Sequence, residues 1–207
     1  MESQTQFLIA SVVQTAGTRR INRDAAAYPA MLRSRLGENA PAELTVLGDA
    51  SLLCAGRTAL FCSARTPGDA ILRAHDAAQR MRDEGVTVIS GFHSPIEEEC
   101  LRILLRGSQP VIVCPARAIE TMRVPAAIRA AFEAGRVLFL SPFAQRPARI
   151  TKESAVRRNE VVAALADDAY IAHVAPSGGT RSNLANARWV GRAEGRLNAS
   201  GETKFLE

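Results

Sequence analysis

Two short segments of this 207-residue chain carry residue types that bind anions. Residues 177–180 (Ser-Gly-Gly-Thr) place two glycines between hydroxyl groups, and glycine lets backbone N–H groups approach an anion closely. Residues 157–159 (Arg-Arg-Asn) add two guanidinium groups, whose planar donors suit phosphate oxygens. Both segments therefore favour phosphate binding, while a plain turn and a solvated helix face are the structural alternatives.

His93 is a further polar side chain that could take part in chemistry, as a general base. No carboxylate partner can be assigned to it, because the acidic run at residues 97–99 suits the start of a helix, where the dipole favours negative charge. Neither a Ser-His-Asp triad nor a metal-ligand spacing among the histidines and cysteines is evident. The sequence thus indicates no catalytic residue, no metal and no cofactor, and it favours a protein that is not an enzyme.

Short apolar runs and amphipathic helices alternate along most of the chain and would position these residues. The runs are continuously apolar, as in strands buried on both faces, and they lie at residues 58–62, 86–89, 111–113, 137–140 and 169–172. Helices are predicted between them and after the last strand, at about residues 68–84, 95–106, 125–134, 153–165 and 180–189.

A glycine separates a helix from the next strand three times in succession, at Gly85, Gly107 and Gly135. Each glycine can take the left-handed conformation that ends a helix. Such regular alternation implies right-handed crossovers and a parallel sheet with helices on both faces. The predicted fold class is therefore α/β, with a Rossmann-like parallel sheet flanked by helices.

The first fifty residues differ from this pattern and are predicted to form a separate N-terminal extension, residues 1–50. A polar, basic stretch there leads into a helix from about residue 25 to residue 36, which Gly37 ends. Residues 51–207 would then form the Rossmann-like domain.

Composition limits the class of protein and its surroundings. Hydrophobic residues make up 47% and charged residues 23%, which is typical of a soluble globular domain. No apolar run approaches the roughly 18 residues of a membrane span, the first residues do not resemble a secretory signal, and the four cysteines lack a C-x-x-C pair. We therefore expect a cytoplasmic protein with reduced, mostly buried thiols and no membrane contact.

The net charge of +5 comes mostly from arginine and favours an anionic partner, although a GC-rich genome produces the same arginine bias. In an open parallel sheet, ligands bind beyond the carboxyl ends of the strands, and small or hydroxyl-bearing residues follow all five predicted strands. We expect a phosphate-bearing ligand at this edge, with Arg65 and Arg158 converging on one pocket. The candidate ligand-binding residues are Ser63, Arg65, Ser90, Gly91, His93, Ser141, Arg157, Arg158, Asn159, Ser177, Gly178, Gly179 and Thr180.

The order of these segments resembles the DprA family of DNA-processing proteins over about residues 25 to 193. The family's motifs G-S-R, S-G-x-A-x-G-I-D, S-E, R-N-R and S-G-S-x-x-T-A are similar, in order, to residues 63–65, 90–97, 140–141, 158–159 and 177–180. Tyr28-Pro29 and Leu32 resemble its upstream Y-P-x-x-L segment. Several positions depart from the pattern: Cys62 precedes Ser63, Glu97 replaces Asp, Pro142 follows Ser141 and Glu160 follows Asn159.

The resemblance implies a SLOG-type Rossmann-like fold that binds single-stranded DNA in a basic pocket at the strand ends. It also implies a homodimer and, for true DprA, a recombinase partner. By position, the residues that would line the pocket are Ser63, Arg65, Ser90, Gly91, Arg158, Asn159, Ser177 and Gly178. The departures indicate a divergent relative.

Two alternatives to DNA binding stay open. A SLOG protein can bind a small nucleotide, as a sensor or as a nucleotide-processing enzyme, and residues 176–180 resemble part of the LOG phosphoribohydrolase segment P-G-G-x-G-T-x-x-E. Asn183 stands where that segment has a carboxylate, which argues against glycosidic cleavage. A scaffold with a degenerate pocket is the other alternative. Neither a Walker A lysine after residues 177–180 nor a G-x-G-x-x-G after the first strand is present, so conventional nucleotide motifs are excluded.

Overall fold

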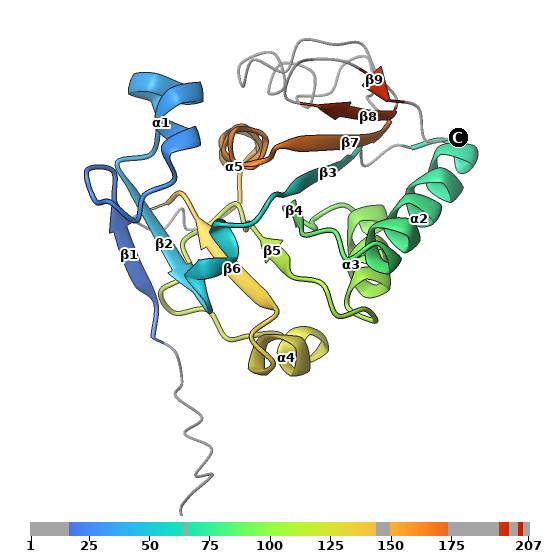
Figure 1. Ribbon diagram of the computed structural model, residues 1–207, viewed down its shortest axis with the longest axis horizontal. Helices are drawn as coiled ribbons and strands as arrows, with labels where there is room; N and C mark the ends of the chain where they lie inside the picture. Colours follow the sequence, from blue (N-terminus) through green and yellow to red (C-terminus); the bar gives the residue numbers. More distant parts are fainter. Residues whose placement is uncertain (1–16, 64–65, 144–149, 174–194, 199–202, 205–207) are drawn as a thin grey trace, which may run out of the picture.

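The computed structural model describes residues 17–63, 66–143, 150–173, 195–198 and 203–204. Within them, one nine-stranded sheet lies between two layers of helices (Figure 1). The strands are β1 (Arg19–Asn22), β2 (Glu43–Leu47), β3 (Thr58–Cys62), β4 (Val88–Ser90), β5 (Val111–Val113), β6 (Val137–Ser141), β7 (Asp168–His173), β8 (Gly195–Asn198) and β9 (Thr203–Lys204). The helices are α1 (Ala30–Leu36), α2 (Gly68–Asp83), α3 (Pro95–Leu104), α4 (Ala126–Glu133) and α5 (Lys152–Leu165), with short 3-10 turns η1 (Gly37–Asn39) and η2 (Ala50–Leu53).

The α/β class, the five apolar strands and the four helices between them are confirmed. Strands β6, β5, β4, β3 and β7 lie side by side in that order and run parallel. Their side chains are almost entirely buried, because each face of the sheet packs against helices. Helices α1 and α5 contribute to the core on one face, and α2, α3 and α4 contribute to the core on the other.

The N-terminal region is where the structure departs most from the expectation. The helix α1 is present, although it begins at Ala30 rather than residue 25 and follows Pro29 as its N-cap. The sequence predicted a helix here and assigned no strand, whereas in the structure β2 pairs with β6 and β1 pairs with β2, both antiparallel. Residues on both sides of position 50 therefore belong to one sheet.

Of the three glycines that were predicted to end helices, two have the expected left-handed backbone conformation. Gly85 and Gly135 both have φ +72°, the left-handed conformation that follows a helix. Gly107 has no positive φ, and α3 ends before it, at Leu104. A Cβ at residue 107 would lie 2.1 Å from Oε1 of Gln109, so this position needs glycine for space rather than for backbone freedom.

The connections between the parallel strands bring their carboxyl ends to one edge of the sheet. From β3 to β6 the chain advances in one direction through α2, α3 and α4, and α5 then carries it back across the opposite face to β7. The direction of strand addition thus reverses between β3 and β7, which lie side by side. The carboxyl ends of strands at such a reversal are the usual ligand position in open α/β sheets.

Two further expectations concern the thiols and the membrane. Cys62, Cys100 and Cys114 are buried and free, as expected, and Cys54 is free but exposed. Among the described residues, no helix has the length and apolar character that a membrane crossing requires. In the same part of the chain, no cluster of three side chains is placed to hold a metal ion.

Candidate functional site

The described candidate residues lie at the last positions of β4 and β6, in the loops after β3 and β4, and in the first half of α5. Five candidates lie outside the described residues: Arg65, Ser177, Gly178, Gly179 and Thr180. The predicted helix at residues 180–189 also lies outside the described residues. Because Arg65 does too, the predicted convergence of Arg65 and Arg158 on one pocket stays a prediction.

Arg158 joins α5 to the ends of two strands at the carboxyl edge. Its side chain is only 5% exposed, and Nη1 donates a hydrogen bond of 3.2 Å to the Cys114 carbonyl oxygen just beyond β5. The guanidinium also lies directly against Gly91, just beyond β4, so a Cβ there would be 1.4 Å from Nη1. Nε is buried and has no hydrogen-bond partner among the described residues. The structure therefore brings Arg158 and Gly91 together, as one buried cation at the ends of β4 and β5.

The loop after β4 is shaped by Ser90 and presents His93. Ser90 is 1% exposed, and its Oγ accepts a hydrogen bond of 3.3 Å from the Phe92 N–H. Phe92 has φ +46°, an uncommon conformation for a residue with a bulky side chain. This turn buries the Phe92 ring and leaves His93 exposed at the edge. Ser90 thus acts on the loop itself, whereas His93 is open to a ligand.

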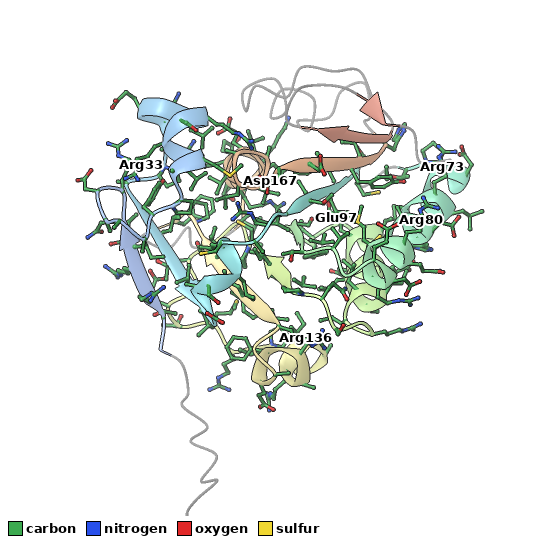
Figure 2. All side chains as sticks on the ribbon, viewed as in Figure 1. Arg33, Arg73, Arg80, Glu97, Arg136 and Asp167 are labelled. Atoms are coloured by element: carbon green, nitrogen blue, oxygen red, sulfur yellow. The ribbon has the colours of Figure 1, made fainter. Side chains whose placement is uncertain are left out.

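Glu97 links the same loop to the end of β3 (Figure 2). Its carboxylate is buried and accepts hydrogen bonds from the backbone N–H groups of Cys62 at 3.1 Å, His93 at 2.9 Å and Ser94 at 3.3 Å. Ser94 in turn caps α3 by accepting from the Glu97 N–H, which completes a capping box. The sequence suggested only that Glu97 suits the helix dipole, because backbone donors carry no residue-type signature.

Ser63 connects the two loops on either side of the strand-order reversal. Its hydroxyl donates a hydrogen bond of 2.9 Å to the His173 carbonyl oxygen at the end of β7. The Ser63 carbonyl oxygen accepts one of 2.6 Å from Thr66, directly before α2. Ser63 therefore follows β3 directly, and its hydroxyl joins the end of β3 to the end of β7, a pairing that the sequence did not predict.

Ser141 is fully buried and serves the loop that follows β5. Its Oγ donates to the Arg117 carbonyl oxygen at 2.7 Å and accepts from the Phe143 N–H at 3.2 Å. The Arg117 side chain is exposed and forms no ion pair or hydrogen bond with the described residues. Ser141 thus positions a loop, and Arg117, which is not among the residues predicted from the sequence, is an accessible cation in that loop.

Arg157 and Asn159 do not join Arg158 at the strand ends. Arg157 donates to the Asn39 carbonyl oxygen in η1 and pairs with Glu160 at 3.1 Å, so its charge is directed toward the N-terminal region. Asn159 is half-buried and forms no side-chain hydrogen bond with the described residues. Of residues 157–159, it is Arg158 that contacts the carboxyl edge of the sheet.

The thiols near this edge are held in their protonated form. Burial raises the pKa of the Cys114 thiol to about 12, although the Arg158 charge acts in the opposite direction. Burial also raises the pKa of Cys62, partly opposed by its hydrogen bond with Thr66. Since the thiolate is the nucleophile, neither cysteine is suited to covalent chemistry near neutral pH.

Comparison with known proteins gives the family. The model of the family described as DNA recombination-mediator protein A matches residues 19–198, and the chain belongs to that family. No curated protein matches the chain. The sequence-based identification of a DprA-like domain is thereby confirmed.

Two solved structures have the same fold. DNA processing protein A from Streptococcus pneumoniae matches with a TM-score of 0.67 and 19% identity, over 84% of this chain and 60% of that one. DNA processing protein A from Helicobacter pylori, whose structure concerns its single-stranded DNA binding mode, matches with a TM-score of 0.63 and 19% identity, over 82% of this chain and 75% of that one. The chain thus spans 60% of the pneumococcal protein, and the likeness establishes a Rossmann-like fold of the DprA type.

Proposed function

We propose that this chain binds single-stranded DNA by its phosphates at the carboxyl edge of the sheet, in DNA processing or recombination. Membership of the DNA recombination-mediator protein A family supports the proposal, as does the single-stranded DNA binding of the Helicobacter pylori relative. The observation that carries it is the Arg158 guanidinium, buried over Gly91 with one nitrogen unpartnered among the described residues.

A buried cation at this place costs free energy unless it meets negative charge. Arg158 has a carbonyl partner but no carboxylate among its described contacts, so its positive charge is left for a ligand at the edge. The exposed side chains of Arg117 and His93 lie in the loops after β5 and β4, the two strands whose ends Arg158 contacts. An extended polyanion can reach several such separate side chains, which one compact phosphate cannot.

The candidate residues divide into two roles under this proposal. Ser90 and Ser141 shape the loops, because both hydroxyls are buried and engaged with backbone groups. Direct contacts with DNA come from Arg158, His93, Arg117 and, by position in the sequence, from Arg65 and residues 177–180. The proposal includes a homodimer and a recombinase partner, which the family resemblance implies, and a cytoplasmic location, which the composition and the cysteine pattern suggest.

A salt series with oligodeoxythymidine, read by fluorescence anisotropy, tests the proposal. Each phosphate contact with single-stranded DNA adds about 0.7 to the slope of log K against log salt. The Arg117→Gln variant should weaken binding and reduce that slope by about 0.7. Arg106→Gln is the matched control, because Arg106 is also exposed but lies before β5, at the opposite edge of the sheet.

Two outcomes contradict the proposal. One is an affinity for oligodeoxythymidine that does not depend on salt or on Arg117. The other is tight, saturable binding of a mononucleotide together with no measurable DNA binding, which favours the nucleotide sensor instead. Analytical ultracentrifugation with and without oligonucleotide checks the proposed homodimer in the same samples.

A further inference from the structure

We propose that Glu97 is an internal anion that occupies a set of convergent backbone N–H donors between the ends of β3 and β4 and so determines where the ligand can bind. The inference deepens the proposed function, on which its DNA-binding part rests. Three backbone N–H groups converge on the carboxylate, from Cys62, His93 and Ser94. Convergent backbone N–H groups at a helix N-terminus form the arrangement by which proteins bind phosphate.

Helix capping alone does not account for this geometry. A capping box requires the Glu97 carboxylate to accept one hydrogen bond, from the Ser94 N–H, and that bond is the longest of the three, at 3.3 Å. The two shorter bonds come from the N–H groups of His93 and Cys62, and Cys62 lies in β3, 35 residues before Glu97. Both carboxylate oxygens are used, and the side chain is 7% exposed.

Glu97 would exclude phosphate from the position that its own carboxylate occupies. A phosphate at the β3–β4 junction would need the N–H groups that Glu97 already holds, and it would meet a negative charge. Phosphates are therefore directed to the two sides of Glu97: to Arg158 and Gly91 near β5, and to the junction of β3 and β7 at Ser63. Glu97 thereby favours a chain of phosphates that reaches both sides over a mononucleotide that needs one compact site.

Chemical rescue tests the internal-anion inference without any DNA. The Glu97→Ala variant should have a lower Tm than the wild type. Acetate or inorganic phosphate at about 50 mM should restore part of the lost Tm, since a ligand that binds only the folded state stabilises that state. The wild type and Glu98→Ala, a matched change at the exposed neighbouring residue, measure the general salt effect at equal ionic strength. A folded Glu97→Ala protein whose Tm responds to these anions no more than the controls do overturns the inference.

A second variant keeps the inference testable if Glu97→Ala fails to fold. Glu97→Gln preserves the shape but turns one oxygen into an NH₂ group that faces backbone donors. We expect it to have a lower Tm than the wild type and to show no anion rescue, because the amide still fills the site. A Glu97→Gln protein with the Tm of the wild type would show that the N–H groups do not require an anion.

Nucleotide binding to the Glu97→Ala variant tests whether Glu97 excludes phosphate from this position. Thymidine monophosphate should bind Glu97→Ala at least about tenfold more tightly than the wild type, a gain of about 1.4 kcal/mol, while oligodeoxythymidine should bind more weakly. An unchanged monophosphate affinity in a variant that acetate rescues refutes the exclusion. If acetate rescues Glu97→Ala but no form of the protein binds oligodeoxythymidine, the proposed function fails while the internal anion stands.

Discussion

Adding one methyl group at Gly91 should disturb the buried cation at the strand ends. A Cβ at this residue would lie 1.4 Å from Nη1 and 2.0 Å from Cζ of Arg158. The backbone itself tolerates alanine, because Gly91 does not have a left-handed φ. The cost of Gly91→Ala therefore comes from the guanidinium, which must leave its place over the loop and its hydrogen bond to the Cys114 carbonyl oxygen.

The magnitude follows from the bond that is lost. A hydrogen bond that involves a charged group contributes about 1.5–3 kcal/mol. Replacing glycine by alanine returns about 0.4–1 kcal/mol, since it reduces the freedom of the unfolded chain. We therefore expect Gly91→Ala to lower the free energy of unfolding by about 1–2 kcal/mol, a fall in Tm of several degrees for a chain of this size.

Urea unfolding of four proteins measures this effect and its cause: the wild type, Gly91→Ala, Arg158→Ala and the double variant. In the Arg158→Ala background the guanidinium is gone, so Gly91→Ala should instead stabilise the protein by about 0.4–1 kcal/mol, and the coupling between the two changes should be about 1.5–3 kcal/mol. Gly68→Ala is the control, because a Cβ there meets nothing within 4 Å. Equal costs of Gly91→Ala in both backgrounds would refute the contact between these two residues as the cause.

Three more predictions follow from individual contacts. Gly48→Ala should cost more than Gly91→Ala and leave little folded protein by circular dichroism, because Gly48 has φ +112° and a Cβ would lie 2.6 Å from the backbone oxygen of Val137. Ellman's reagent at pH 8 should label Cys54 rapidly and the buried thiols only on unfolding, and fast labelling of two or more thiols in the native protein would contradict the burial. Burial raises the pKa of Cys100 and Cys114 from 9.0 to about 12, so the folded state keeps protons that the unfolded state loses. The contribution of these two thiols to stability should thus be constant below pH 9 and fall between about pH 9 and pH 12 in urea titrations, and replacing either thiol by alanine should flatten that fall.

The central sheet could be predicted from the sequence because its signals are local. Each parallel strand is a continuous apolar run, and Gly85 and Gly135 mark the change from helix to strand by their backbone conformation. The strand β1 has no such signal, since Ile21 is its single buried residue and two arginines precede it. The strand β2 is apolar but depends on a partner, β6, that lies far away in the sequence, so its pairing could not be derived from spacing.

The candidate site was predictable in part for a related reason. Arg158 and Gly91 were identified because their residue types suit phosphate, and the structure joins them. Arg157 has the same residue type but is directed to a backbone carbonyl of Asn39, a contact that the sequence cannot reveal. The role of Glu97 was missed because its partners are main-chain N–H groups, which every residue type except proline possesses.

The pairing of β2 with β6 also affects how the protein is made. Thr45 lies opposite Ser141, so β2 is synthesised long before the strand that completes it. Until β6 emerges from the ribosome, the side chains of Leu44 and Val46, both fully buried in the native protein, remain exposed to solvent or to other chains. Pairing between distant segments is slow, and unpaired apolar strands invite aggregation. The strands that are translated first are therefore among the last to complete their pairing in the sheet. A nascent chain halted before residue 137 should depend on chaperones for its solubility.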